Sequence, residues 1–338
     1  MWFYFIIFLF LSFFCYINIK QKNTILWFLA FLLIIIAGFC GSISKDHDSY
    51  INGYNLITSG KLSNPLSLFI IAEVVNKIFH NSIFLFLLYA VLGVSLKILA
   101  IKRLSEFWFF SILIYFSYYF FLHELTQLKA GVAAAFILLS IPSIYEKKLK
   151  LFLIYAGSAI FFHISALVLL PLYYFKKDKI PIWYFFLIPI GYILFFTHAN
   201  TSSLINLIDI DVIRTKYALY KSLNTVDKIN IFNILMLFRY VFCGLLLWKW
   251  KFLREKNVYS VILIKFYILS CFIFISFADI PGIAFRLSEL LAIVEIILIP
   301  YIIYLFDIRL LGKLIVGLIG FLFLCLVLLY TKLVTSYF

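Results

Sequence analysis

Three short polar segments stand out in a chain that is otherwise apolar. They are KDHDSY at 45–50, HELTQLK at 123–129 and IPGIAFRLSE at 280–289, and a single histidine, His163, stands between two further apolar runs. Together they supply carboxylates, imidazoles, phenols, amides and basic groups, which are the side chains that transfer protons and bind anions. An ionisable group surrounded by hydrocarbon is costly, so we expect the functional residues in these segments.

The composition indicates a polytopic membrane protein. Of the 338 residues 65% are hydrophobic and 13% are charged, whereas soluble domains carry about 25% charged residues. Apolar stretches repeatedly reach the roughly 20 residues that a spanning helix needs. The net charge of +14 is spread over short loops, which is a signal of membrane topology and not of nucleic-acid binding.

The apolar runs predict about ten transmembrane helices in one all-α integral membrane domain that covers 1–338. Their expected bounds are 2–19, 25–43, 83–101, 107–122, 130–145, 181–197, 232–250, 258–277, 284–305 and 310–330. The first run lacks the basic start and the cleavage site of a secretory signal, so we predict a spanning helix there. Basic residues after the third helix (Lys97, Lys102 and Arg103) and after the first and fifth helices favour the cytoplasmic side. The amino terminus and the three polar segments are therefore expected on the outer face.

The run 151–175 does not fit a single crossing. It is apolar, yet both of its flanks, EKKLK and KKDK, are basic. We therefore predict a re-entrant helical hairpin that enters from the cytoplasm and turns back near FFHIS. Irregular backbone at membrane depth is tolerated where it is buried in protein or lines a wet cavity, so His163 is expected to face such a cavity.

Two outer loops, 44–82 and 198–231, are long enough to do more than connect helices. In the first, polar and apolar residues recur at helical spacing, which predicts a helix that lies in the outer interface. Its polar face includes Glu73 and Lys77, whose spacing permits a surface ion pair. Its apolar face is expected to contain Phe69, Ile70, Ala72, Val75 and Phe79.

The chain lacks the sequence motifs of several enzyme classes. The histidines are scattered and the five cysteines fall inside predicted helices, so neither a metal site nor a disulfide framework is predicted. Asp46, His47 and Asp48 could touch a divalent ion, but adjacent residues rarely converge on one. The sequence shows no phosphate-binding loop, dinucleotide motif or nucleophile elbow. No cofactor is predicted, and any reaction must use substrates that are already activated.

Charged residues inside the predicted helices need partners, since each costs about 2.5–3.5 kcal/mol at the bilayer centre. Lys265 and Glu295 lie at comparable depth, and we expect either an ion pair or a Lys265 side chain that reaches the cytoplasmic interface. Arg239 lies near the outer surface, on the side of the polar segments. Arg286 and Glu289 are three residues apart, so they share a helix face that could line a cavity.

Several short motifs occur together in a pattern typical of one family. They are DHDSYINGY at 46–54, TQLKAGVAAAFILLSI at 126–141, FFHISAL at 161–167, and Arg286 followed by an apolar helix that ends at Pro300. In this combination the chain resembles the EpsG-like family of exopolysaccharide and O-antigen polymerases (Wzy type). The family's first-loop motif, D-x-x-x-Y, corresponds to Asp46 and Tyr50. The resemblance covers most of the chain.

The resemblance implies a metal-independent glycosyltransferase of the cytoplasmic (inner) membrane. Such an enzyme polymerises oligosaccharide repeat units for O-antigen, capsule or exopolysaccharide, with its active site facing the periplasm or the outside. Its substrates are polyprenyl-pyrophosphate-linked oligosaccharides in the membrane lipid. A flippase and a chain-length regulator are the implied protein partners, and nucleic acid is not one.

The same resemblance, together with the residue types, gives the expected site. The candidate general base is His163, with Asp46 as the competing choice. Tyr50 and Gln127 are expected to orient sugar hydroxyls. The groups expected to stabilise the leaving pyrophosphate or to line the cavity are Arg286, Arg239, Lys129, Arg214 and Glu289.

Each assignment has an alternative. His163 could join helices by a hydrogen bond, Asp46 could only order its loop, and Arg286 could simply pair with Glu289. For the whole chain, the alternatives are an O-antigen ligase or another lipid-phosphosugar glycosyltransferase, a transporter or flippase of lipid-linked glycans, and a structural subunit of an export assembly.

Overall fold

The structure is a computed structural model that describes the chain except for residues 40, 42–45, 62–65, 198–228, 332 and 334–338. The described part is helical and contains no strand. Its helices form two compact units. Unit 1 comprises Met1–Tyr173 and Glu295–Phe338, and unit 2 comprises Tyr174–Val294.

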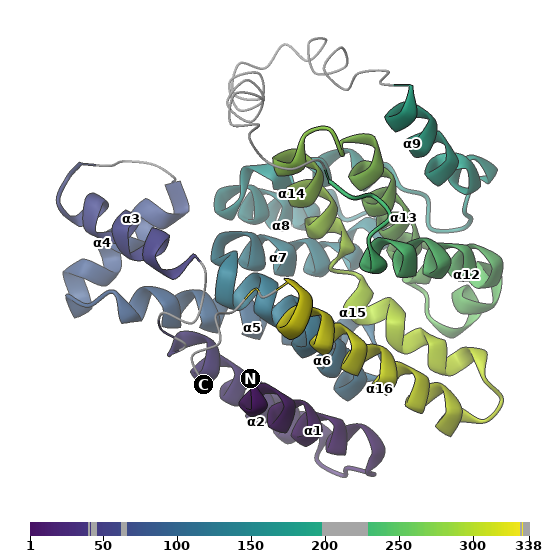
Figure 1. The fold of residues 1–338 in the computed structure, drawn as a ribbon, viewed down its shortest axis with the longest axis horizontal. Coiled ribbons are helices and arrows are strands. Elements are labelled where there is room, and N and C mark those ends of the chain that lie inside the picture. The colour runs from purple at the N-terminus through teal and green to yellow at the C-terminus, as the bar shows by residue number, and fades with distance from the viewer. Residues whose placement is uncertain (40, 42–45, 62–65, 198–228, 332, 334–338) are drawn as a thin grey trace. The chain divides into compact units, whose positions relative to one another are not determined.

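Unit 1 contains the helices around which the candidate site is built, and α8, α7 and α5 lie side by side within it (Figure 1). With η marking a 3-10 or π segment, its helices are α1 (Trp2–Tyr16), α2 (Lys22–Gly38), α3 (His47–Thr58), α4 (Leu66–Phe79), α5 (Ile83–Leu104), α6 (Trp108–Ile114), η2 (Tyr115–Thr126), α7 (Leu128–Tyr145), α8 (Leu149–Phe162), η3 (Ile164–Tyr174), α15 (Glu295–Leu298), η5 (Ile299–Leu305), α16 (Arg309–Cys325) and η6 (Leu326–Thr331). Unit 2 contains η4 (Ile182–Phe186), α9 (Leu187–Phe196), α12 (Ile234–Lys256), α13 (Ser260–Ser276) and α14 (Pro281–Ala292).

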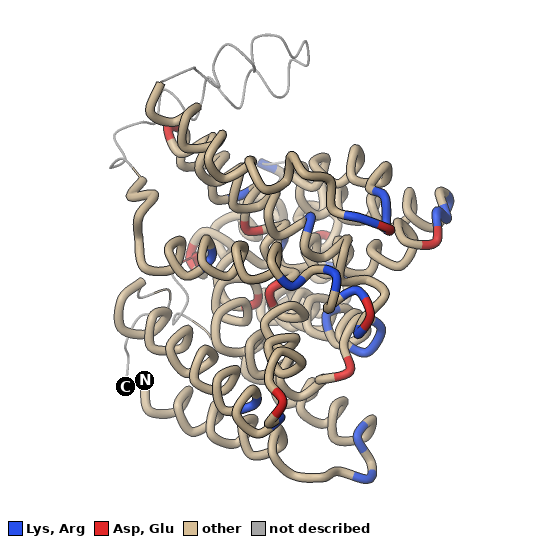
Figure 2. Tube along the Cα trace, turned by 90° about the vertical axis from the view of Figure 1, so that its right-hand side faces the viewer, with Lys and Arg blue, Asp and Glu red and all other residues tan. Residues whose placement is uncertain are grey.

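The helices confirm a membrane protein. Within the described residues, four segments are long and apolar enough to cross a membrane: Ile83–Leu104, Leu128–Tyr145, Pro281–Leu305 and Arg309–Thr331. Each coincides with a predicted span. The other predicted spans coincide with shorter helices, with consecutive ones such as α6 and η2, or, for 232–250, with the 23-residue α12. Lys and Arg lie mostly at the turns between helices (Figure 2), where a topology signal belongs.

The loop 44–82, predicted to lie outside, contains the predicted amphipathic helix, α4, and a second helix, α3, that was not predicted. Glu73 and Lys77 of α4 form the expected ion pair, at 3.8 Å. The predicted apolar face is partly wrong, because Ile70 and Phe79 are exposed. α4 packs against α3 and α5, and that contact rotates its buried side. The side chains that it buries are Ser67, Leu68, Ile71, Ala72 and Val75.

The segments α8 and η3 form the helical hairpin that the basic flanks predict. The side chain of Lys147, before α8, donates to the carbonyl of Tyr173 at 2.7 Å, and the Tyr173 hydroxyl donates to the carbonyl of Lys147 at 2.8 Å. The two arms are about 21 and 22 Å long by their helical rise, so they match. His163 forms the turn, with an extended backbone at φ −148° and ψ 115°. The chain thus turns back on itself at His163, whereas re-entry into the membrane from the cytoplasm stays a prediction.

Cysteine labelling tests that entry. In a chain whose five native cysteines are replaced, Lys177→Cys should resist a membrane-impermeant maleimide added to intact cells, because the hairpin returns both basic flanks to the cytoplasm. Lys61→Cys, exposed in the outer loop, should react. Equal labelling of the two positions would show that 151–175 crosses the membrane once.

Candidate functional site

The D-x-x-x-Y motif lies along one face of α3. Asp46 precedes the first helical residue, and Tyr50 and Tyr54 follow at intervals of four, which places the three side chains on the same side. The Tyr54 hydroxyl donates to Asn76 Oδ1 at 3.1 Å and ties α3 to α4. Asp46 is exposed and Tyr50 is half-buried. The first part of the motif is therefore accessible to a ligand, whereas its last tyrosine is structural.

Tyr50 lies against the start of α7. Its phenol oxygen accepts hydrogen bonds from the backbone amides of Lys129 and Leu128. Gln127, the residue before the helix, makes no side-chain cap. The first amides of a helix have no partner within the helix and bind anions readily. In this structure the Tyr50 phenol accepts from the first amides of α7.

Tyr50 is a hydrogen-bond donor and not a base. Burial raises its pKa, and the neighbouring Tyr89 and Asp46 raise it further, against the opposing effect of the Lys129 and Leu128 amides. The phenol therefore keeps its proton at neutral pH. This agrees with the predicted role of Tyr50 in orienting sugar hydroxyls, which itself stays a prediction.

The tip of the hairpin lies beside Tyr89. α8 runs antiparallel to α7, and its 14 residues extend about 21 Å toward the N-terminal half of α7. There Phe162 stacks on Phe136 of α7, with ring centroids 6.0 Å apart, and meets Tyr89 of α5 at 6.2 Å. The Ser67 hydroxyl donates to the Phe162 carbonyl at 3.4 Å. These contacts fix the segment that carries His163.

His163 follows Phe162 and is half-buried. Its Nδ1 accepts the backbone N–H of Ser165 at 3.3 Å. With that lone pair occupied, the neutral imidazole carries its proton on Nε2. In this geometry the ring presents a donor, which weakens its candidacy as general base relative to Asp46.

His123 is a candidate that the sequence did not single out. It lies on η2 and is 0% exposed, and neither ring nitrogen has a hydrogen-bond partner among the described residues. Its ring is 5.4 Å from that of Tyr119, and it lies close enough to His163 for the two charges to interact. A buried polar group without a partner is rare and often marks a functional position. Its segment, HELTQLK, was recognised, but burial depends on packing that no local pattern shows.

The buried centre of unit 1 is an ion pair between Lys97 and Glu124, at 2.5 Å. Lys97 was predicted to belong to the cytoplasmic turn after the third helix. That prediction is wrong, because Lys97 lies within α5 and is 0% exposed. Its Nζ also donates to the carbonyl of Gly131 at 2.8 Å, and the Tyr115 hydroxyl donates to Glu124 at 2.8 Å. In the sequence, the one indication of this pair was the position of Lys97 inside the apolar run 83–101.

Two glycines make room for this pair. A Cβ at Gly93 would lie 2.1 Å from Glu124 Oε2, and a Cβ at Gly131 would lie 2.9 Å from His123 Cβ. Without side chains at these positions, η2 can approach both α5 and α7 closely. The buried carboxylate and imidazole are therefore accommodated by their neighbours' small size.

The π-helical winding of η2 brings the pair into register. Tyr115 and Glu124 are nine residues apart, which in an α-helix is about two and a half turns and places them on opposite faces. Residues 115–126 form a π-helix instead, and both side chains then face Lys97. The Tyr119 hydroxyl donates to Glu295 Oε2 at 2.7 Å, which fixes a further point of the same segment. π-Helical segments are rare and occur frequently at functional sites.

Three predicted site residues belong to unit 2. Arg239 of α12 is buried, and its Nη1 lies 3.8 Å from Met236 Sδ. Met236 shares a core cluster with Ala284 of α14. On α14, Arg286 is exposed and Glu289 is buried, so the two differ in access although they are three residues apart.

Lys265, also in unit 2, is buried and donates from Nζ to the carbonyl of Lys176. Its ammonium group lies 5.7 Å from the ring centre of Phe175 and 5.8 Å from that of Tyr184. The alternative, that Lys265 reaches the cytoplasmic interface, agrees with this contact to the basic segment 176–179 and stays a prediction. Its pairing with Glu295 stays a prediction.

The predicted site residues therefore fall into two groups. Unit 1 brings together Asp46, Tyr50, the start of α7 with Gln127 and Lys129, and the hairpin tip with His163. Unit 2 holds Arg239, Arg286 and Glu289. Arg214 lies outside the described residues. Among the described residues no group of three His, Cys, Asp or Glu side chains could hold a metal ion.

Fold and site define a helical membrane protein with ionisable groups and an uncapped helix start inside an apolar frame. The chain belongs to the EpsG family, whose profile matches residues 23–338. The family is linked to exopolysaccharide biosynthesis. No curated protein and no solved structure matches the chain.

The buried pair gives a stability prediction. Lys97→Met leaves Glu124 as an uncompensated buried charge and should lower the free energy of unfolding by about 3–5 kcal/mol. Adding Glu124→Gln should restore most of the loss. Unfolding of the purified protein in detergent measures both.

Lys77→Met is the matched control, because its partner Glu73 forms an exposed pair that is worth about 1 kcal/mol or less. Equal losses at positions 77 and 97 would show that the buried pair does not hold unit 1 together.

Proposed function

We propose that this chain is a polysaccharide polymerase that joins polyprenyl-pyrophosphate-linked oligosaccharide repeat units at the outer leaflet of the cytoplasmic membrane. The observation that supports it best is the group formed in unit 1 by Asp46, Tyr50, the start of α7 and the hairpin tip. It combines a carboxylate, a protonated phenol, an imidazole and a helix start whose amides suit an anion. Membership of a family linked to exopolysaccharide biosynthesis agrees with it.

The reaction is a glycosyl transfer with a pyrophosphate leaving group. The hydroxyl oxygen of the acceptor sugar attacks the anomeric carbon of the donor glycan. The bond from that carbon to the pyrophosphate oxygen breaks, polyprenyl pyrophosphate departs with the electron pair, and a base takes the hydroxyl proton. Such a donor is already activated, and the protein has to supply orientation, a base and positive charge.

Asp46 is the better placed base. It is exposed at the start of α3, and it lies close enough to Tyr50 to act on that side chain's pKa. His163, with Nδ1 occupied by the Ser165 amide, offers an Nε2–H donor that suits a phosphate or sugar oxygen. His123 lies behind it as a second imidazole.

The leaving group needs cations and oriented amides. In unit 1 the start of α7 supplies both through its amides and Lys129. Arg239, Arg286 and Arg214 are the further cations of the proposal, with Glu289 as the residue that orients Arg286. The ten-crossing topology, with the amino terminus and 198–231 outside, would place all of them on the outer face.

The lipid part of the substrate also has a candidate position. A largely apolar cavity of about 240 Å³ lies beside α3 and is lined by residues that include Gly38, His47, Ile51 and Phe86. Phe86 meets both His47, at 4.6 Å, and Tyr50, at 6.3 Å between ring centroids. The first isoprene units of the lipid would fit such a cavity next to the motif, with the rest of the chain in the bilayer. A flippase and a chain-length regulator are the proposed protein partners.

A glycan ladder tests the proposal. Cells that lack this chain should accumulate single repeat units, and the wild type should restore the ladder. Asp46→Ala and Arg286→Ala, at matched membrane levels, should not restore it, because each removes a group that the transfer needs. The readout is the size distribution of lipid-linked glycan.

Lys77→Ala, an exposed basic residue of the same outer loop region, should restore the ladder fully and serves as the control. If cells without the chain instead accumulate full-length polymer on its lipid carrier, polymerisation lies elsewhere and a ligase or export role replaces the proposal.

A second pair of variants separates the two candidate bases. Asp46→Asn keeps the shape of the side chain but cannot accept a proton, so the rate of polymerisation should fall by about 10²–10⁴-fold. His163→Gln keeps a hydrogen-bond donor and should lose about tenfold or less. The measurement is the rate of ladder formation by purified protein with lipid-linked substrate. The reverse order of losses would assign the base to His163.

A further inference from the structure

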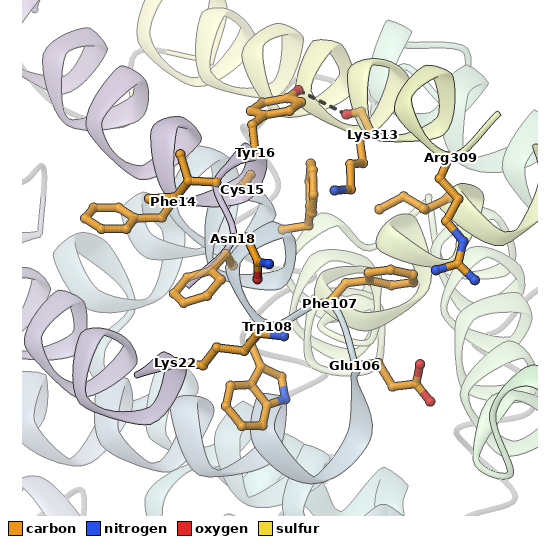
Figure 3. Close-up of a pocket in the computed structure, with 14 residues that line it drawn as sticks. Phe14, Cys15, Tyr16, Asn18, Lys22, Glu106, Phe107, Trp108, Arg309 and Lys313 are labelled. Carbon is orange, nitrogen blue, oxygen red and sulfur yellow. Dashed lines mark hydrogen bonds between the residues drawn. The ribbon is translucent and has the colours of Figure 1, made fainter. Parts of the chain in front are cut away.

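Unit 1 contains a second cavity, which is polar and has no part in the proposed reaction. It has a volume of about 430 Å³ and lies where the turns between α1 and α2, α5 and α6, and η5 and α16 meet (Figure 3). This is the end of α5 that is remote from Tyr89, which lies about 20 Å away along the helix. The distribution of basic residues assigns this end to the cytoplasmic side.

The cavity is positively charged. Lys22, Arg309 and Lys313 surround it (Figure 3). Within the described part of the chain, none of these three side chains has a carboxylate at ion-pair distance. Glu106 is the one carboxylate among the lining residues, and it accepts a hydrogen bond from the Tyr304 hydroxyl at 2.9 Å. The three cations therefore outnumber the one carboxylate of the cavity and form no ion pair with it.

Three helices also begin at this cavity. α2 starts at Lys22, α6 at Trp108 and α16 at Arg309, and all three residues line it. None of the three starts has a side-chain cap. Each start carries a partial positive charge and amides without a partner in the helix. Convergence of three such starts makes a site for an anion rich in acceptor oxygens.

The placement of the cations works against the stability of the empty site. Lys22 and Arg309 are the first residues of their helices, where the helix dipole repels a positive charge. Arg309 and Lys313 are four residues apart on α16, where like charges repel. Membrane topology by itself explains why basic residues occur in these turns. It does not explain why they converge on one cavity at which three uncapped helices begin. A bound anion would relieve all of these repulsions.

We propose that this cavity binds the phosphate headgroup of an anionic phospholipid of the cytoplasmic leaflet. Exposed apolar side chains are available for the acyl chains: Ile17 lines the cavity, and Ile308, Leu310 and Leu314 adjoin Arg309 and Lys313 in the sequence. Basic pockets between membrane helices on the cytoplasmic side are a common setting for anionic lipids. Phe107 and Trp108 form an aromatic wall beside the cations. The proposal does not depend on the polymerase reaction.

Lipid titration tests the site. The full chain in detergent is titrated with short-chain phosphatidylglycerol or phosphatidylcholine, and bound lipid is counted by native mass spectrometry. The wild type should bind phosphatidylglycerol more tightly than phosphatidylcholine. Arg309→Gln with Lys313→Gln should weaken phosphatidylglycerol binding by about 30-fold, as the loss of two cations beside an anionic lipid predicts.

Two further variants control for charge and folding. Lys249→Gln with Lys251→Gln removes the same charge from α12 of unit 2, where neither residue lines the cavity, and should bind like the wild type. Arg309→Lys with Lys313→Arg preserves the charge and should retain binding, which separates loss of the site from loss of the fold. Equal binding by the wild type and the Arg309→Gln, Lys313→Gln chain would overturn the proposal. Inorganic phosphate that binds as tightly as the lipid would overturn the lipid assignment.

Discussion

The buried pair of Lys97 and Glu124 is the interaction on which the arrangement of unit 1 depends. Two charges taken out of water need close contact and further hydrogen bonds to offset their desolvation, and here Tyr115 and the Gly131 carbonyl supply them. Tyr115 reaches the carboxylate because η2 is wound as a π-helix, and η2 reaches α5 because Gly93 has no side chain. The same winding directs the adjacent His123 toward α7, so the pair also sets the position of the candidate site.

Local signals were sufficient for much of the fold. Apolar length predicted the spans, because a membrane imposes that length on any sequence. The basic flanks of 151–175 predicted the hairpin, because positive charge on both sides disfavours a crossing. The position of His163 at its turn followed directly. Helical spacing also predicted α4, whereas the face that α4 buries did not follow, since it is decided by contact with α3 and α5.

The rest depends on contacts between segments that are distant in the sequence. The π-helical winding of η2 allows Glu124 to contact Lys97, which lies 27 residues earlier in the sequence. Nothing within HELTQLK indicates that winding. The burial of Lys97 and the isolation of His123 are consequences of the same packing. α3 is different, because the interval of four between Asp46, Tyr50 and Tyr54 is a helical interval. That signal was present in the motif, but the loop's polar composition masked it.

Helix starts at the two ends of unit 1 suit two different anions. At the start of α7 a neutral phenol already accepts the amides, and such bonds are about half as strong as those to a charged oxygen. An arriving oxyanion can replace the phenol, and the phenol can replace a departing one, which suits a leaving group that must be released in every cycle. The starts of α2, α6 and α16 have no side-chain cap and stand beside three cations that form no ion pair within the described residues. That arrangement suits an anion that stays bound.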